Sequence, residues 1–473
     1  MCAVIARNVV SAGAIIAPWL QWGRRGFCAV LDQGLFACAN FALNVALARW
    51  LTPQAYGSFT IAYSVFLLLT ILHAEIVTSP MLTFGAGKYA RGFRTYLGFL
   101  ICGHTLLTVA VAVVLAGVGC VAWLRGAPSL GQAFFGFALV TPFVTLLWFA
   151  RSAFYVRLEP GHAAAGGALY VVLLGGGLFA LYHAHRLTVL TALGSLGLAS
   201  LFVSIPLIAL LRPALDLNAM RSIFRRNTTV LREPSGWEQT AGGGKTEGTA
   251  VTPAMLAHDH LRYAKWSLAT YGANWVGSNA HYLVLSSTAG LAAVATMRVL
   301  DTMLLPFYNY FTAISKLLVA VFGARAGRLG IPASLVTGVA IGWGIQGALA
   351  YLGIRLYAEK ILALLYGSTY TRYDHVLTWY ALTLIPEAIN GMLLSLCRAM
   401  ARTDLTFVIQ AVFAMAVVPA YIAAAQHGVQ GITLSRVALS YAVLPLPFLL
   451  LKWTRNRTDR AEPGAMRRAV GVP

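Results

Sequence analysis

The chain has 473 residues, of which 59% are hydrophobic and only 11% are charged, and its mean hydropathy is +0.72. A water-soluble globule of this size needs far more polar surface, so the composition predicts an integral membrane protein. The net charge of +20 is interpreted as membrane topology rather than as a nucleic-acid-binding surface. The apolar segments are continuous rather than alternating, which predicts membrane helices instead of a barrel.

A bilayer core of about 30 Å is crossed by roughly 20 apolar residues in a helix. Twelve segments of the chain meet this requirement, which predicts an all-α membrane protein with about twelve spans. The first six predicted spans are residues 27–48, 56–84, 97–122, 132–150, 163–182 and 188–211. The second six are residues 266–288, 291–322, 332–353, 376–397, 405–425 and 428–451.

The positive charges alternate between the two sides of these spans. If the N-terminus is cytoplasmic, 26 of the 35 Lys and Arg residues fall on the cytoplasmic side, six on the other side and three within spans. Cytoplasmic connections are enriched in Lys and Arg, so both termini are predicted to be cytoplasmic.

The predicted domain organisation has two six-helix bundles, residues 27–211 and 266–451. Residues 212–265 contain the only long connection, whose Gly, Thr and Pro content predicts a flexible cytoplasmic linker. An interfacial or cytoplasmic segment (1–26) precedes the bundles, and a basic cytoplasmic tail (452–473) follows them.

Proline placement indicates that the bundles are related. The even-numbered spans of both halves carry prolines, namely Pro80, Pro142 and Pro206 in the first half and Pro306, Pro386 and Pro445 in the second. The positions within the spans match closely in the second and third pairs and more loosely in the first pair. A proline removes an intrahelical hydrogen bond and bends the helix, so matched bends predict two bundles that can rock against each other. The alternative is that proline is simply more common in membrane helices.

A short motif between the first two spans resembles a known family. Residues 47–59 read Leu-Ala-Arg-Trp-Leu-Thr-Pro-Gln-Ala-Tyr-Gly-Ser-Phe. This run is similar to the Leu-Ala-Arg, Leu-Gly-Pro and Glu-Tyr-Gly-x-Phe signature of polysaccharide-type (Wzx-like) flippases, with Thr52 in place of the frequent glycine. These flippases belong to the multidrug, oligosaccharidyl-lipid and polysaccharide exporter (MOP) superfamily. Two further segments resemble the same flippases, namely Leu-Leu-Tyr-Gly at 364–367, with Tyr370, and Arg-Ala-Met-Ala-Arg at 398–402.

The resemblance implies a function. Such a protein flips a polyprenyl-diphosphate-linked oligosaccharide from the inner to the outer leaflet by alternating access, for surface polysaccharide biosynthesis. The implied partners are this lipid-linked substrate, membrane lipids and other proteins of polysaccharide assembly. The implied location is the inner, or cytoplasmic, membrane of the cell.

Charged residues inside predicted spans are candidates for function, because a charge near the bilayer centre costs about 2.5–3.5 kcal/mol on insertion scales. Three cations are predicted to bind a diphosphate in a central cavity: Arg298, Lys316 and Arg436. Four acids are candidates for proton or ion coupling: Asp32, Glu75, Asp301 and Glu387. The alternatives are pairing of Arg298 with Asp301, snorkelling of the other two cations, and hydrogen bonds between helices.

Polar residues of the seventh and eighth spans are predicted to line the same cavity. They are Asn274, Asn279, His281, Tyr308 and Asn309. Their helical spacing spreads them over more than one face, so some of them pack between helices or lie at the interface instead.

Other functions remain as alternatives. A multidrug or metabolite exporter of the same superfamily is the second hypothesis, and a membrane polysaccharide polymerase or ligase is the third. The protein is not expected to be an enzyme, because the longest outer connection, residues 354–375, reads in part as an amphipathic interfacial segment. No cofactor, metal or nucleic acid is expected. No nucleotide is expected either, since the Gly-Lys-Thr at 244–246 lacks the preceding glycine of a P-loop.

Overall fold

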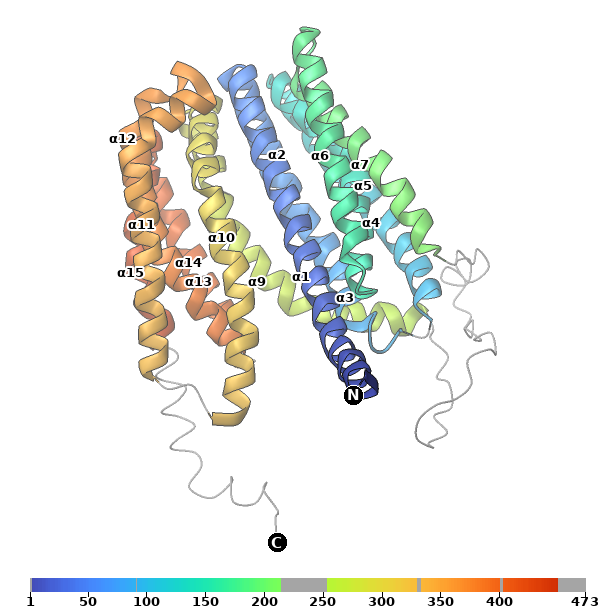
Figure 1. The fold of residues 1–473 in the computed structure, drawn as a ribbon. Helices are drawn as coiled ribbons and strands as arrows, with labels where there is room; N and C mark the ends of the chain where they lie inside the picture. The colour runs from blue at the N-terminus through green and yellow to red at the C-terminus, as the bar shows by residue number, and fades with distance from the viewer. Residues whose placement is uncertain (1, 91, 214–252, 330–332, 400–402, 450–473) are drawn as a thin grey trace. The chain divides into compact units, whose positions relative to one another are not determined.

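The computed structural model describes residues 2–90, 92–213, 253–329, 333–399 and 403–449, and these residues are nearly all helical. Ten helical stretches among them are long and apolar enough to cross a membrane. Each of the twelve predicted spans falls on a helix of this described part, which confirms the all-α membrane fold (Figure 1). The predicted placement of both termini in the cytoplasm stays a prediction.

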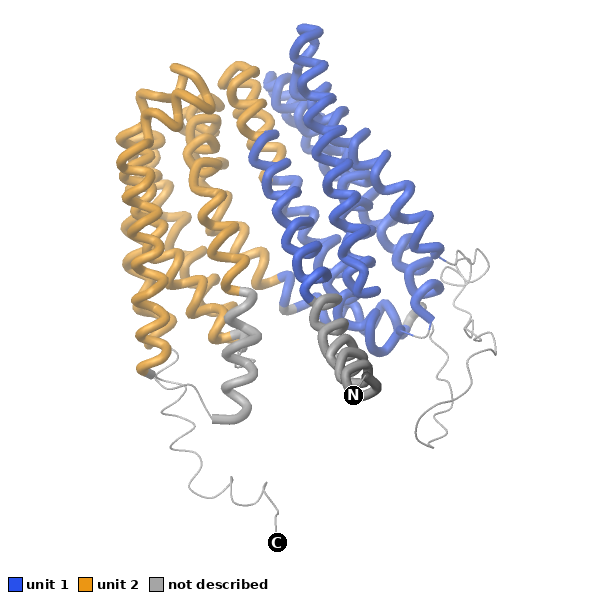
Figure 2. The backbone as a smooth tube through the Cα atoms, viewed as in Figure 1, with its two compact units in different colours: residues 1–43, 65–268 blue, residues 44–64, 269–473 orange. Residues whose placement is uncertain are grey.

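The chain forms two compact units (Figure 2). Unit 1 comprises Met1–Leu43 and Val65–Leu268. Its helices are the first parts of α1 (Cys2–Trp50) and α9 (Pro253–Thr288), the end of α2 (Pro53–His73), a π-helical turn (Ala74–Thr78), α3 (Ser79–Phe84), α4 (Phe93–Leu124), α5 (Pro128–Val156), α6 (Pro160–His183) and α7 (Val189–Leu211). Helix α5 packs against α4, α6 and α7 and is the central helix of this unit.

Unit 2 comprises Asn44–Ser64 and Ala269–Pro473. It contains the remaining parts of α1, α2 and α9 together with α10 (Leu291–Leu329), α11 (Ala333–Tyr366), α12 (Asp374–Tyr380), α13 (Leu384–Ala399), α14 (Thr403–Ala424) and α15 (Gly428–Val443). Short 3-10 turns join several of these helices: Gly367–Thr369, Thr371–Tyr373, Ala381–Thr383 and Ala425–His427. Helix α13 packs against α10 and α11.

Several helices extend beyond the predicted spans. Helix α1 begins at Cys2, so the predicted N-terminal segment continues into the first span as one helix. Helix α9 begins at Pro253, so residues 253–265 are helical rather than flexible linker, while most of the remaining linker and the basic tail lie outside the described residues. Helix α11 continues to Tyr366 and includes the segment predicted to lie at the interface. Adding residues to an existing helix is easier than starting one, so helices readily outlast their apolar cores.

Two of the prolines in the even-numbered spans lack the N–H group that would bond the carbonyl one turn earlier. In both cases a side chain from another helix donates a hydrogen bond to that carbonyl. Pro80 has no N–H to bond the carbonyl of Ile76, which instead accepts a hydrogen bond from His260 Nδ1 at 2.6 Å. Pro386 likewise has no N–H to bond the carbonyl of Leu382, and Tyr441 donates its hydroxyl to that oxygen at 3.2 Å. Both proline segments are therefore hydrogen-bonded to another helix of their own unit.

His260 lies in a polar cluster of unit 1 at the start of α9. Because His260 Nδ1 donates to a carbonyl, its Nε2 accepts the hydroxyl hydrogen of Tyr96 at 2.8 Å. Burial lowers the pKa of His260, which keeps the ring neutral. Next to it, Asp259 accepts hydrogen bonds from Lys88 (2.5 Å) and Tyr89 (2.6 Å), and both bonds lower the pKa of Asp259. These contacts explain why α9 begins before its predicted span.

The motif residues 47–59 are packing residues of unit 2. A Cβ at Gly57 would overlap the carbonyl oxygen of Leu291, so only glycine permits α2 to approach α10 this closely. Arg49 donates from Nη1 to the carbonyl oxygens of Leu364 (2.8 Å) and Leu365 (3.4 Å), in the last turn of α11. The first motif therefore binds the second one, Leu-Leu-Tyr-Gly at 364–367, whereas the motif at 398–402 lies partly outside the described residues.

Candidate functional site

A polar cavity in the interior of unit 2

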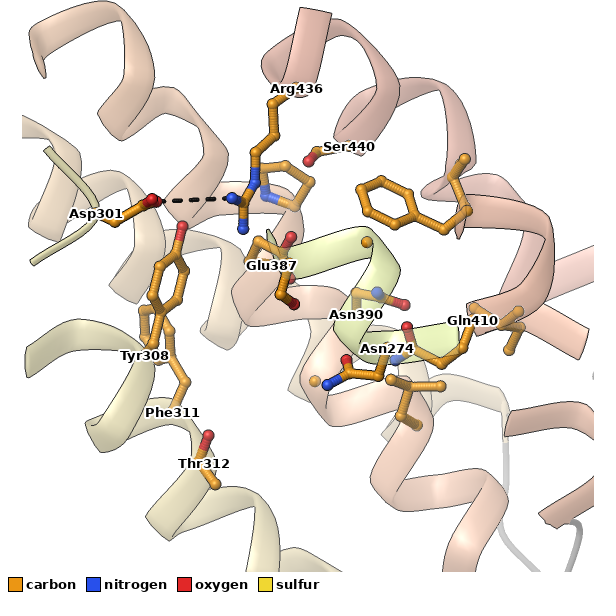
Figure 3. A pocket seen from close by; sticks show the side chains of 18 of the residues that line it. Asn274, Asp301, Tyr308, Phe311, Thr312, Glu387, Asn390, Gln410, Arg436 and Ser440 are labelled. Carbon is orange, nitrogen blue, oxygen red and sulfur yellow. Dashed lines mark ion pairs between the residues drawn. The ribbon is translucent and has the colours of Figure 1, made fainter. Parts of the chain in front are cut away.

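A cavity of about 520 Å³ lies within unit 2 (Figure 3). Its walls come from α9, α10, α13, α14 and α15. Among the twelve predicted site residues, seven line it: Asn274, Asn279, Arg298, Asp301, Tyr308, Glu387 and Arg436. Helix α9 carries so many polar residues that it is absent from the ten apolar stretches, because one of its faces lines this cavity.

Asp301 is the centre of the polar network beside the cavity. Its Oδ2 accepts hydrogen bonds from Tyr282 at 2.6 Å and from His281 Nε2 at 3.0 Å. Its Oδ1 accepts the hydroxyl hydrogen of Tyr380 at 2.6 Å and lies 3.6 Å from Nη1 of Arg436. The two tyrosine bonds have the short length of charge-assisted hydrogen bonds. Asp301 therefore joins α9, α10, α12 and α15.

Arg298 lies one turn before Asp301 but has different partners. Its Nε donates to Asn44 Oδ1 at 2.9 Å, and its Nη1 lies 3.4 Å from the hydroxyl of Tyr282. Its Cζ lies 5.0 Å from the ring centre of Tyr63, which is within cation–π range. Among the described residues, no carboxylate lies within 4.0 Å of its guanidinium. Arg298 thus presents a cation to the cavity without a neutralising ion pair.

Arg436 is more buried, with 8% of its surface exposed. Its Nη1 faces Asp301, its Cζ lies 5.6 Å from the ring centre of Tyr380, and its buried Nε has no hydrogen-bond partner. Figure 3 shows the guanidinium projecting between Asp301 and Glu387. A buried donor without a partner is costly, which is typical of a group that meets a ligand.

Glu387 is the second carboxylate of the cavity and contrasts with Asp301. It lies on the first turn of α13, is half-buried, and makes no hydrogen bond or ion pair with any other residue in the described part of the chain. The cavity therefore has two arginines, one fully bonded carboxylate and one carboxylate that is available to a ligand.

The other predicted lining residues differ in position. Tyr308 faces the cavity, and its hydroxyl lies 3.2 Å from that of Thr383. Asn279 donates to the carbonyl of Trp275 at 3.2 Å. His281 is fully buried behind Asp301, and Asn309 is exposed and is not part of the cavity lining. Lys316 belongs to α10, but its side chain lies outside the described residues.

The two remaining acids belong to unit 1. Asp32 receives two hydrogen bonds from Arg151, of 3.0 and 2.7 Å, and one from Tyr155 of 2.7 Å. Arg151 also lies over the ring of Phe36, and its buried ion pair with Asp32 joins α5 to α1. Glu75 lies on the π-helical turn and accepts a hydrogen bond from Ser79 at 3.1 Å. The predicted role of these acids in ion coupling stays a prediction.

Several residues of the cavity were not among the predicted ones. Asn44 and Tyr380 are buried partners of Arg298 and Asp301, and Asn390 and Gln410 line the cavity. Their polar side chains inside predicted spans were the available signal. An amide or a phenol in an apolar segment is a weaker signal than a charge, because it is also common in helix packing.

Similarity to known transporters

No family model matches the sequence, and no curated protein sequence matches it either. Solved structures do. An inward-facing multidrug resistance MATE family transporter of the MOP superfamily is 12% identical, with a TM-score of 0.70 over 92% of this chain and 99% of that one. The lipid II flippase MurJ in an inward closed conformation is 13% identical, with a TM-score of 0.65 over 92% of this chain and 87% of that one.

A third structure adds information on pocket charge. It is a MOP superfamily transporter from Pyrococcus furiosus whose reverse polarity of binding pocket is said to suggest a different function. This protein is 13% identical, with a TM-score of 0.60 over 92% of the present chain and 95% of its own. At these identities the similarity establishes the fold alone, which is that of MOP superfamily transporters.

Proposed function

We propose that this protein is a MOP-type flippase that moves a polyprenyl-diphosphate-linked oligosaccharide from the inner to the outer leaflet of the inner membrane. The fold supports transport as the general activity, because proteins as different as a multidrug transporter and a lipid II flippase share it. The motif at residues 47–59 supports the polysaccharide-type branch, and its residues form the contacts between α1, α2, α10 and α11.

The observation that carries the choice of substrate is the charge of Arg298. This guanidinium lies within an apolar span and beside a cavity, and in the described structure only neutral groups contact it. A charge held this way raises the free energy of the empty protein, and a diphosphate would compensate it through charge-assisted, bidentate hydrogen bonds. Arg436 has a free Nε and supplies a second donor to the same cavity.

A liposome assay tests this proposal. Purified protein is reconstituted with a labelled polyprenyl-diphosphate-linked glycan, and the fraction of glycan that becomes accessible on the opposite leaflet is measured over time. Arg298→Ala removes the cation and is expected to slow flipping about 10- to 100-fold, which corresponds to a lost charge-assisted contact of about 1.5–3 kcal/mol. Arg125→Ala is the matched control, because Arg125 is exposed after the end of α4.

A cellular experiment tests the same proposal independently. Deletion of the gene should leave lipid-linked repeat units on the cytoplasmic leaflet, and the wild-type gene should restore their export. Normal export in the deletion strain would contradict the flippase function. Full export by a well-expressed Arg298→Ala variant would remove Arg298 from the substrate path while leaving the flippase function in place.

A second function is favoured by one observation, namely the carboxylate of Glu387, which has no partner in the described structure. A free carboxylate in a half-buried cavity suits an organic cation, as a multidrug exporter requires. Proton-driven uptake of a cationic dye into liposomes, abolished by Glu387→Gln, would support this alternative over the lipid-linked glycan.

A further inference from the structure

We propose that the cavity of unit 2 contains a subsite for a neutral saccharide ring, formed by Asn274, Glu387, Asn390 and Gln410. This inference rests on the proposed flippase function and specifies which part of the substrate the cavity binds. The four side chains come from α9, α13 and α14. Figure 3 shows Asn274, Asn390 and Gln410 gathered on one side of the cavity, with Glu387 between them and Arg436.

The four side chains differ from Asp301 and its partners in how they are bonded. Within the described part of the chain, none of their side chains makes a hydrogen bond or an ion pair with another residue. Polar side chains inside a membrane protein normally bond to a neighbouring helix, as Tyr282 and Tyr380 do with Asp301 in the same cavity. Four free groups on one wall therefore indicate a surface that is completed by a ligand.

Buried polar atoms without hydrogen-bond partners also surround this wall of the cavity. Asn390 Oδ1, Ser315 Oγ and Ser440 Oγ are all buried without a hydrogen-bond partner. All three residues line the cavity, on α13, α10 and α15. Small rotations of these side chains would bring the atoms to a ligand that offers both donors and acceptors.

The apolar part of the cavity wall includes two aromatic rings. Phe311, on α10, is buried and packs against Trp343, with ring centres 5.7 Å apart. Phe413, on α14, lies so close to α9 that a Cβ at Gly277 would be only 2.9 Å from its ring. Both aromatic rings line the cavity, and Gly277 leaves room for the second of them.

This combination matches the chemistry of a sugar. A pyranose ring carries neighbouring hydroxyl groups, each a donor and an acceptor, which amides and carboxylates bond in pairs. The same ring has apolar C–H faces that pack against aromatic side chains. An organic cation would use Glu387 but would leave the three amides without partners. A volume of about 520 Å³ is within the usual size of ligand sites.

The position of the subsite also fits the order of groups in the proposed substrate. Arg298 and Arg436 line the same cavity and are the groups proposed for the diphosphate. In a lipid-linked glycan the first sugar is bonded directly to the diphosphate. The first sugar would therefore enter the same cavity as the diphosphate, and the amides line that cavity together with the arginines.

The experiment compares two lipids on the purified full-length protein in nanodiscs. One probe is bare undecaprenyl diphosphate, and the other is the lipid-linked repeat unit that accumulates in the deletion strain. The variants are Asn390→Leu and Gln410→Met, which keep the approximate size of each side chain and remove its hydrogen bonds. Asn309→Leu is the matched control, because Asn309 is exposed and does not line the cavity.

We expect the wild type to bind the glycan-bearing lipid about tenfold more tightly than the bare lipid. Each variant should reduce this preference about threefold to tenfold and leave the affinity for the bare lipid unchanged, whereas the Asn309→Leu control should change neither the preference nor the bare-lipid affinity.

Four outcomes would overturn the inference or its premise. Equal binding of both lipids by the wild type, or an unchanged preference in both variants, overturns the saccharide subsite and leaves the flippase function standing. Loss of bare-lipid binding in both variants would assign these residues to the diphosphate and also overturn the subsite. Failure of the wild type to bind either lipid would instead overturn the proposed function.

Discussion

Replacement of Asp301 by asparagine is the most informative test of the polar network. The substitution keeps the shape of the side chain but removes its charge and one of its two acceptor oxygens. In the wild type the carboxylate accepts three hydrogen bonds, from Tyr282, His281 and Tyr380, and faces Arg436 at 3.6 Å. An amide satisfies only part of this set, because its NH2 group cannot accept a hydrogen bond.

The magnitude follows from these contacts. At least one buried donor loses its acceptor, at about 1–3 kcal/mol, and the remaining bonds lose their charge assistance. Arg436 also loses its only ion pair among the described residues, and removing one partner of a buried pair costs about 3–5 kcal/mol. Because these contributions overlap, we expect Asp301→Asn to destabilise the protein by about 3–5 kcal/mol.

The matched control is Glu387→Gln in the same cavity. Glu387 has no hydrogen bond or ion pair to lose in the described structure, so its neutral isostere should change stability by less than about 1 kcal/mol. The assay is unfolding of the purified protein in one detergent, followed by circular dichroism. Equal melting temperatures for Asp301→Asn and the wild type, or a larger loss in Glu387→Gln, would refute this account of the network.

Three further predictions concern packing, pH and a helix end. Gly57→Ala should destabilise the protein by about 1–3 kcal/mol because its Cβ would overlap the Leu291 carbonyl, and Gly103→Ala, at a glycine with open space around it, should show no such loss in the same melting assay. Burial lowers the pKa of His260, so below about pH 6.5 the unfolded chain binds a proton that the folded chain does not. Stability should therefore fall as the pH falls from about 6.5 to 5, and His260→Asn should melt with a smaller pH dependence; an unchanged dependence would contradict this role. Arg49→Ala removes the donor to the last turn of α11 and should lower the free energy of unfolding by about 0.5–1 kcal/mol. Amide hydrogen exchange should become faster at that turn, and an unchanged exchange rate there would contradict the role of this contact.

The sequence by itself determined the class of the protein and the position of its helices. A long apolar segment in a bilayer has no water to bond its backbone, so it must form a helix whatever its neighbours are. Segment length and charge are local properties, and every predicted span falls on a helix for this reason. The same reasoning singled out Arg298, Asp301, Glu387 and Arg436, because a charge in an apolar segment is conspicuous.

The ends of helices and the partners of those charges were decided by the tertiary structure. Asn44 bonds Arg298 from a distance of 254 residues along the chain, and Arg151 bonds Asp32 from a distance of 119 residues. The division into units also passes through α1, α2 and α9 instead of falling only in the linker. Which side chains meet depends on how helices rotate and cross, and hydropathy carries no information on either. For that reason Arg298 and Asp301, three residues apart, could be expected to pair, yet the fold gives each of them other partners.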